Sequence, residues 1–255
     1  MPLAEVSMNW TIPQRENLLK RLQTEPPRAV WESVCFARGG FLRYDPDEER
    51  EVARAVMRLV RHNAFLLADR LAGLGWHPLT PPMVGTPTPR PFPGEAEAEE
   101  FGPLPLALSA FWEVVGGLDF VWDYKRGPAP DLFGGYKIEE LDPLCIDAPQ
   151  TLPFLAKEWK ELRAAGEIGP GDKVPLDLAP DALHKANISG GSPYGLRLPD
   201  PDPDPMFIGD DFALRFTAYL RLSFRWGGFP GLAALPRSAV ADARVASLTE
   251  GFLPF

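Results

Sequence analysis

The feature that most constrains the fold is a long amphipathic helix predicted at 45–75, DPDEEREVARAVMRLVRHNAFLLADRLAGLG. Asp45 is a natural N-cap, Pro46 fits the first turn, and Glu48 follows the cap by three residues. The side chains expected on its buried stripe recur at helical spacing: Val52, Val56, Leu59, Val60, Asn63, Leu66, Leu67 and Leu71. Before it, the sequence predicts a short helix at 13–27 and an element of undecided type at 30–40.

Proline is the main anomaly of the composition, at 30 of 255 residues, about twice its usual share. The stretch 77–100, HPLTPPMVGTPTPRPFPGEAEAEE, combines many prolines with an acidic run. Because it offers few side chains to bury and its prolines disrupt backbone ladders, we interpret it as an extended connector. We therefore expect an N-terminal helical segment at 1–76, a proline-rich acidic linker at 77–100 and an α+β domain at 101–255. A docking site for an aromatic groove is the alternative interpretation of the proline-rich stretch.

A helix followed directly by a strand is predicted in LPLALSAFWEVVGGLDFVW (104–122). Leu108, Phe111, Trp112 and Val115 share one helix face, and the glycine pair that follows suits a left-handed cap. The residues at 118–124 then alternate between apolar and acidic, as in a strand with one buried face.

Short elements separated by turn residues fill the rest of the chain. Further strands are predicted at 144–147, 174–178, 185–189 and 194–198, and helices at 150–166 and 210–228, with an apolar tail at 245–255 that docks on the body. The spacing favours an antiparallel meander over alternating strands and helices. The expected fold class is α+β, a short-stranded, mainly antiparallel sheet flanked by helices, with an N-terminal helical segment.

The net charge of −9 and the pI of about 4.9 bear on partners. Such a surface repels phosphate backbones, which argues against nucleic acid and favours a basic protein partner. The alternative is an ordinary acidic cytoplasmic protein. The start, MPLAEVSMNW, has no signal-peptide pattern, and no stretch approaches the roughly 18 apolar residues of a membrane span. We therefore expect a cytoplasmic location and no membrane association.

A search for reactive groups finds no recognisable catalytic, metal or cofactor motif. The phosphate-cradling loop, the dinucleotide fingerprint and the serine nucleophile elbow are all missing. His62, His77 and His184 lack metal-type neighbours at helical spacing, and Cys35 and Cys145 are far apart. Cys145 lies in an apolar strand, where a thiol is inert. We therefore expect no catalytic residue, no metal and no cofactor.

The most unusual segment is LPDPDPDPMFIGDD (198–211), in which aspartates alternate with prolines. It fails the calcium-loop pattern, which needs a turn glycine and a final glutamate. One interpretation is a stiff acidic loop in which Asp210 or Asp211 caps the next helix. The other is an acidic prong presented to a basic partner, since prolines reduce the ordering entropy lost on binding. The candidate binding residues are Asp200, Asp202, Asp204, Asp210 and Tyr194.

The stretch GPLPLALSAFWEVVGGLDF (102–120) resembles the SMI1/KNR4-like superfamily. That family shows a Leu-Pro, a helix with aromatic and aliphatic anchors, a glycine near the helix end and then a strand. Leu104, Pro105, Phe111, Gly116 and Phe120 match these positions, and FTAYLRLSFRWGGFPGL is similar to the family's closing helix. The resemblance covers at most 101–255, with a longer and more proline-rich insert. Bacterial members often serve as immunity proteins against polymorphic toxins, so the resemblance implies a binding function.

The chain also resembles a group of uncharacterised bacterial proteins carrying FWEVVGG, ANISGG and YLRLSFRWGGFPG, a resemblance that implies no activity. Three hypotheses follow. The first is a non-enzymatic, immunity-like protein that neutralises a basic partner, such as a nuclease toxin, through acidic loops. The second is a hydrolase-like enzyme that uses carboxylates around 200–211 with Tyr194 or His184. The third is an adaptor that docks through the helix at 45–75.

Overall fold

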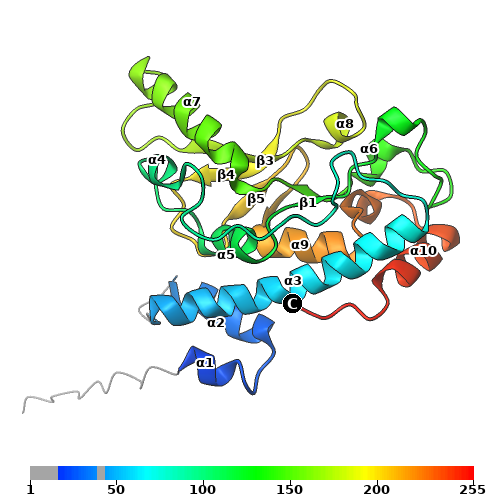
Figure 1. Ribbon diagram of the computed structural model, residues 1–255, viewed down its shortest axis with the longest axis horizontal. Helices are drawn as coiled ribbons and strands as arrows, with labels where there is room; N and C mark the ends of the chain where they lie inside the picture. The colour runs from blue at the N-terminus through cyan, green and yellow to red at the C-terminus, as the bar shows by residue number, and fades with distance from the viewer. Residues whose placement is uncertain (1–16, 39–43) are drawn as a thin grey trace, which may run out of the picture.

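The computed structural model describes residues 17–38 and 44–255, and helix α3 (Pro46–Gly73) runs through the middle of its layers (Figure 1). The Asp45 side chain accepts hydrogen bonds from the backbone N–H groups of Asp47 and Glu48, so the predicted cap is confirmed. Most of the predicted stripe is fully buried: Val52, Val56, Val60, Asn63, Leu67 and Leu71.

Two short helices, α1 (Leu18–Arg21) and α2 (Pro27–Arg38), cover one side of α3. The element of undecided type at 30–40 is therefore helical as far as it is described. The part of the predicted helix 13–27 before residue 17 lies outside the described residues. Val30, Trp31 and Val34 of α2 are buried, which places an apolar face against the core.

On the opposite side of α3, helices α5 (Leu106–Val114) and α9 (Phe216–Arg225) lie between α3 and the larger sheet (Figure 1). Edge-to-face aromatic contacts connect these two helices with each other and with the sheet. The ring centroids of Phe111 and Phe216 are 5.5 Å apart, and that of Phe207 in the sheet lies 5.9 Å from Phe216. The aromatic stripe predicted in the closing helix is core, as expected.

The larger sheet is an antiparallel meander of four strands in the order β3–β4–β5–β6. The strands are β3 (Val174–Ala179), β4 (Tyr194–Leu198), β5 (Met206–Ile208) and β6 (Ala213–Arg215). A second, two-stranded antiparallel sheet pairs β1 (Leu118–Asp119) with β2 (Cys145–Ile146). The predicted α+β class, with short antiparallel strands flanked by helices, is confirmed.

Two predicted elements are wrong in type. Residues 185–189 do not form a strand, because Asp181 caps a short helix, α8 (Ala182–Lys185), which runs into a turn with Asn187 at φ 61°. The predicted helix 210–228 begins only at Phe216, since the residues before it form β6 and pair with β5. Neither Asp210 nor Asp211 therefore caps this helix.

The segment 77–100 buries more than its composition suggests, because its few apolar side chains face the core. Met83, Val84 and Phe92 are buried, and Val84 forms a β-bridge with Leu118. A short helix, α4 (Glu95–Glu99), ends the segment. The expectation that this stretch has too few side chains to join a packed core is wrong.

The glycine pair after α5 lets the segment 77–100 pass close to the backbone at the end of this helix. Gly116 has φ +90°, and a Cβ there would lie 2.1 Å from the carbonyl oxygen of Thr86. Gly117 accepts a hydrogen bond of 2.9 Å from the N–H of Gly85. Any side chain at 116 would push residues 85–86 away. Glycine therefore both ends the helix and allows this close backbone contact.

The remaining helices lie around this body. They are α6 (Ile138–Leu141), α7 (Leu152–Ala164), α10 (Ala239–Thr249) and the 3-10 turns η1 (Tyr124–Arg126), η2 (Pro149–Thr151) and η3 (Pro230–Ala234). The tail docks as predicted, with Leu248 and Phe255 buried. No described helix combines the length and apolar character that crossing a membrane requires.

Candidate functional site

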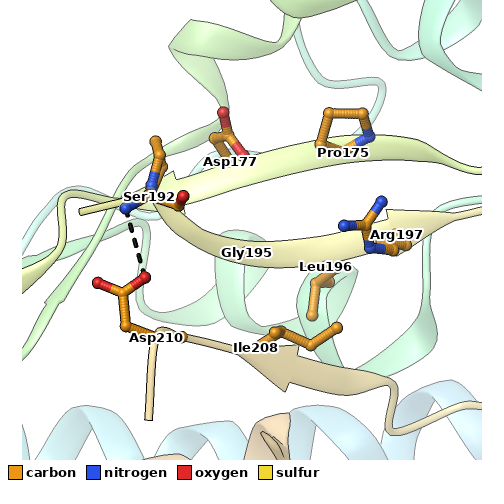
Figure 2. A pocket seen from close by; sticks show the side chains of 10 residues that line it. Pro175, Asp177, Ser192, Gly195, Leu196, Arg197, Ile208 and Asp210 are labelled. Carbon is orange, nitrogen blue, oxygen red and sulfur yellow. Dashed lines mark hydrogen bonds between the residues drawn. The ribbon is translucent and has the colours of Figure 1, made fainter. Parts of the chain in front are cut away.

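A pocket of about 120 Å³ lies on the outer face of the four-stranded sheet (Figure 2). Strand alternation turns Leu176, Leu196 and Phe207 toward the core and leaves the other face open. The register aligns Asp177 of β3, Gly195 of β4 and Ile208 of β5 in one row across that face. Gly195 has no side chain at the centre of this row, and a Cβ there would lie 2.3 Å from the carbonyl oxygen of Leu176 in β3. The pocket lies over this glycine and its neighbours.

Charged groups surround this pocket, which we call the sheet pocket (Figure 2). Burial raises the pKa of Asp177, Glu158 raises it further, and Arg197 partly offsets both. Asp210 is exposed at the turn after β5 and accepts a 3.4 Å hydrogen bond from the N–H of Ser192. Arg197 is exposed on β4 and has no hydrogen-bond or ion-pair partner among the described residues. Two carboxylates and one guanidinium therefore line a small cavity with partly apolar walls.

An aspartate–histidine pair lies beside the sheet pocket. Oδ2 of the buried Asp181 is paired with Nδ1 of His184, whose side chain is 49% exposed. Burial acts to raise the pKa of Asp181, but hydrogen bonds from the side chain and backbone of His184 and from the backbone of Leu183 bring it below its ordinary value. The aspartate holds the imidazole in one orientation, as a supporting carboxylate does for a general base.

The backbone at Gly191 brings this pair close to the sheet pocket. Gly191 has φ +72°, and a Cβ there would lie 2.6 Å from Oδ1 of Asp181 and 2.8 Å from Oδ2 of Asp210. The two carboxylates therefore flank the same glycine. Only a residue without a side chain leaves room for both of them.

Tyr194 is buried next to the site and contacts α8. Its ring is buried, its hydroxyl accepts a 3.1 Å hydrogen bond from the N–H of Ala182, and Nζ of Lys185 lies 4.5 Å from its centroid. Burial and the charge of Asp142 raise the pKa of Tyr194. Tyr194, the first residue of β4, thus contacts α8, and its ring is not exposed to solvent.

The aspartates of the proline-rich segment separate into two groups. Asp210 lines the sheet pocket, whereas Asp200, Asp202 and Asp204 lie along the loop that leads into β5. Asp202 accepts a 2.7 Å bond from Arg215, and its own N–H donates to Asp200. These three residues are therefore engaged within the protein.

Asp204 is buried and accepts hydrogen bonds from the backbone N–H of Thr217 at 2.9 Å and from its hydroxyl at 2.5 Å. It therefore satisfies a free N–H in the first turn of α9, the task that the sequence assigned to Asp210 or Asp211. Burial raises its pKa, and the bonds from Thr217 oppose that rise.

Neither thiol is placed for chemistry. Burial raises the pKa of Cys35 to about 12 and that of Cys145 well above its ordinary value. Within residues 17–38 and 44–255, no three histidine, cysteine, aspartate or glutamate side chains are grouped to hold a metal ion. The site offers carboxylates and a histidine, without a prepared thiolate.

Sequence reasoning missed Asp177, Asp181 and Arg197. A signal for Asp181 was present, because Pro180-Asp181 before an alanine and a leucine is a helix-start pattern. Asp177 and Arg197 carry no such signal, since only the strand register brings them to one pocket. In comparisons with known proteins, no family model, curated protein or solved structure matches the chain.

Proposed function

We propose that this protein is a cytoplasmic, non-enzymatic binding protein of the immunity or antitoxin kind, which neutralises a basic protein partner. In this proposal the sheet pocket receives one lysine or arginine side chain of the partner. The observation that carries it is the placement of Asp177 and Asp210 on the lining of one small, partly apolar cavity on an open sheet face.

The cavity suits a long cationic side chain. Pro175 and Ile208 offer apolar surface to the methylene stem, while the two carboxylates can meet the charged head. Burial has already removed part of the hydration of Asp177, which is why its pKa is raised. The attraction between a cation and a poorly hydrated carboxylate is stronger than that between a cation and a carboxylate in bulk water.

The surroundings add contact area and steering. Met206 and Ile208 of β5 are 42% and 38% exposed, so apolar side chains border the acidic groups. Interfaces commonly place such apolar residues at the centre and polar ones at the rim. The net charge of −9 would speed the approach of a basic partner at low salt.

The identity of the partner is part of the proposal. Nuclease toxins must grip phosphates and are therefore suitable basic partners. The resemblance of 101–255 to the SMI1/KNR4-like superfamily, whose bacterial members often act as immunity proteins, supports this choice.

The test uses a capped, lysine-rich glycine peptide as a stand-in for the partner's basic loop. Its binding to the whole chain is measured by nuclear magnetic resonance, following the amides of Gly195 and Gly209, which line the pocket. We expect these two amides to shift, and the affinity to fall about threefold to tenfold in Asp177→Asn and in Asp210→Asn.

Asp211→Asn is the matched control, because Asp211 is the exposed neighbour of Asp210 and does not line the pocket. It removes the same charge and should change the affinity less than twofold. Equal losses in Asp210→Asn and Asp211→Asn would show that the peptide senses only overall charge. Shifts confined to residues outside the pocket would reject the site.

The hydrolase alternative is favoured by one observation, the pairing of His184 with the buried Asp181 next to Asp210. It requires a turnover of chromogenic carboxylic or phosphoric esters that His184→Gln abolishes. His62→Gln, at an exposed histidine of α3, is the control.

The adaptor alternative gains no support, because α1, α2, α5, α9 and α10 all pack against α3 and its apolar stripe is buried.

A further inference from the structure

A second cavity, of about 350 Å³, lies among helices α2, α3, α9 and α10 and the chain that follows α10. It shares no residue with the sheet pocket. Among the described residues, the arginines Arg28, Arg221 and Arg225 line it, and no aspartate or glutamate does. On a chain with a net charge of −9, a cavity whose described charged side chains are all cations is a local exception.

Arg221 is the most deeply placed of the three. Its Nε donates a 2.7 Å hydrogen bond to the main-chain oxygen of Phe255, but its Nη2 is buried and has no hydrogen-bond partner among the described residues. Burial lowers the pKa of Arg221, and the nearby charge of Arg28 lowers it further, against weaker opposing effects of Asp204 and Glu32. A buried guanidinium with an unsatisfied donor costs free energy that a bound anion would recover.

The other two arginines leave cationic capacity at the cavity. Arg225 is exposed at the end of α9 and has no hydrogen-bond or ion-pair partner in the part of the chain that the structure describes. Arg28 bonds to Glu32 on its own helix at 2.8 Å, an exposed pair of the kind that exchanges partners at little cost. Two arginines can therefore turn toward an anion without breaking a buried contact.

The walls of the cavity are aromatic. Phe224 lies at their centre, with ring centroids 5.8 Å from Phe252 and 5.7 Å from Phe255, both edge to face. Asn63 holds the chain beside the cavity through two 2.8 Å bonds with the backbone of Leu253, so its amide is already engaged. The cavity thus combines cationic groups with a preformed apolar wall.

We propose that this cavity binds a small organic anion with an apolar body. Its carboxylate or phosphate group would accept hydrogen bonds from Arg221 and Arg225, and its body would lie against the three phenylalanines. Planar guanidinium groups match both kinds of oxyanion, and binding cavities of this size usually combine apolar walls with a few placed polar groups.

The experiment is isothermal titration of the whole chain with five probes. They are 3-phenylpropionate, phenyl phosphate, acetate, inorganic phosphate and the neutral 3-phenylpropionamide. We expect at least one of the two aromatic anions to bind, with acetate, inorganic phosphate and the amide about tenfold weaker or more. Comparison of the two aromatic anions shows whether a carboxylate or a phosphate is preferred.

Arg225→Gln should lower the affinity for the tighter-binding aromatic anion about tenfold, and Arg28→Gln should lower it less. Arg58→Gln is the matched control, an exposed arginine of α3 outside the cavity, and should leave the affinity unchanged. No heat from either aromatic anion up to about 10 mM would overturn the proposal. Equal binding of the neutral amide, or equal losses in Arg225→Gln and Arg58→Gln, would do the same.

Discussion

Nζ of Lys185 lies 2.6 Å from Oδ1 of Asp142, and the lysine side chain is fully buried. Asp142 ends α6 in the left-handed region, with φ 48°, so this ion pair joins α6 to α8. The ammonium also lies over the ring of Tyr194, whose hydroxyl contacts α8. The pair therefore fixes the helix that carries Asp181 and His184 beside the sheet pocket.

Breaking this ion pair on one side should be costly. Lys185→Met leaves Asp142 largely buried without its partner, and we expect the free energy of unfolding to fall by about 3 to 5 kcal/mol. Urea unfolding followed by tryptophan fluorescence measures the change.

Removing both charges is the control for that prediction. Lys185→Met combined with Asp142→Asn should recover a large part of the loss, because no unpaired charge remains and asparagine tolerates positive φ. Strict additivity of the two single changes would contradict a direct ion pair.

The buried Asp204 should be structural rather than a contact for a partner. Asp204→Ala removes the acceptor for both the N–H and the hydroxyl of Thr217, so we expect about 2 to 4 kcal/mol of destabilisation in urea unfolding. Asp211→Ala, at an exposed carboxylate of the same segment, should cost less than about 0.5 kcal/mol. Comparable losses in the two variants would disprove the capping role.

Local signals explain what the sequence predicted correctly. The cap at Asp45 and the buried stripe from Val52 to Leu71 depend on neighbours within one helix, and both are confirmed. The glycine pair at 116–117 also reads locally as a helix end. Such features need no knowledge of which distant segments meet.

The errors arise where long-range contacts decide. The helical spacing of Phe212, Phe216 and Tyr219 hid a strand at 213–215, which forms because β5 provides a hydrogen-bonding partner. The few apolar residues of 77–100 are buried because β1 and the glycines after α5 receive them. The sheet pocket depends on strand register in the same way, which no local pattern encodes.

Both cysteines should resist alkylation in the folded protein. Cys145 is 5% exposed and Cys35 is only partly exposed, and burial raises both pKa values, so little thiolate is present near neutral pH. Iodoacetamide labelling followed by mass spectrometry should show slow modification of both in buffer and rapid modification in urea. Rapid labelling of Cys145 in buffer would revive a nucleophilic role.

The pH dependence of stability should reveal Asp147, which follows β2. Burial raises its pKa to about 6, and the charge of Asp119 contributes, with Lys185 opposing. The folded protein therefore holds this proton more tightly than the unfolded chain, where the pKa is ordinary. The stabilising contribution is complete below the unfolded pKa of 3.8 and is lost as the pH rises through about 6.

Asp147→Asn removes that titration while keeping the backbone groups that contact Trp112 and Leu178. The unfolding free energy of the variant minus that of the wild-type protein should rise by about 1 to 3 kcal/mol as the pH goes from about 4 to about 7. Urea unfolding at several pH values measures this gap. Asp69→Asn, on the exposed face of α3, should show a constant gap, and a constant gap for Asp147→Asn would refute the raised pKa.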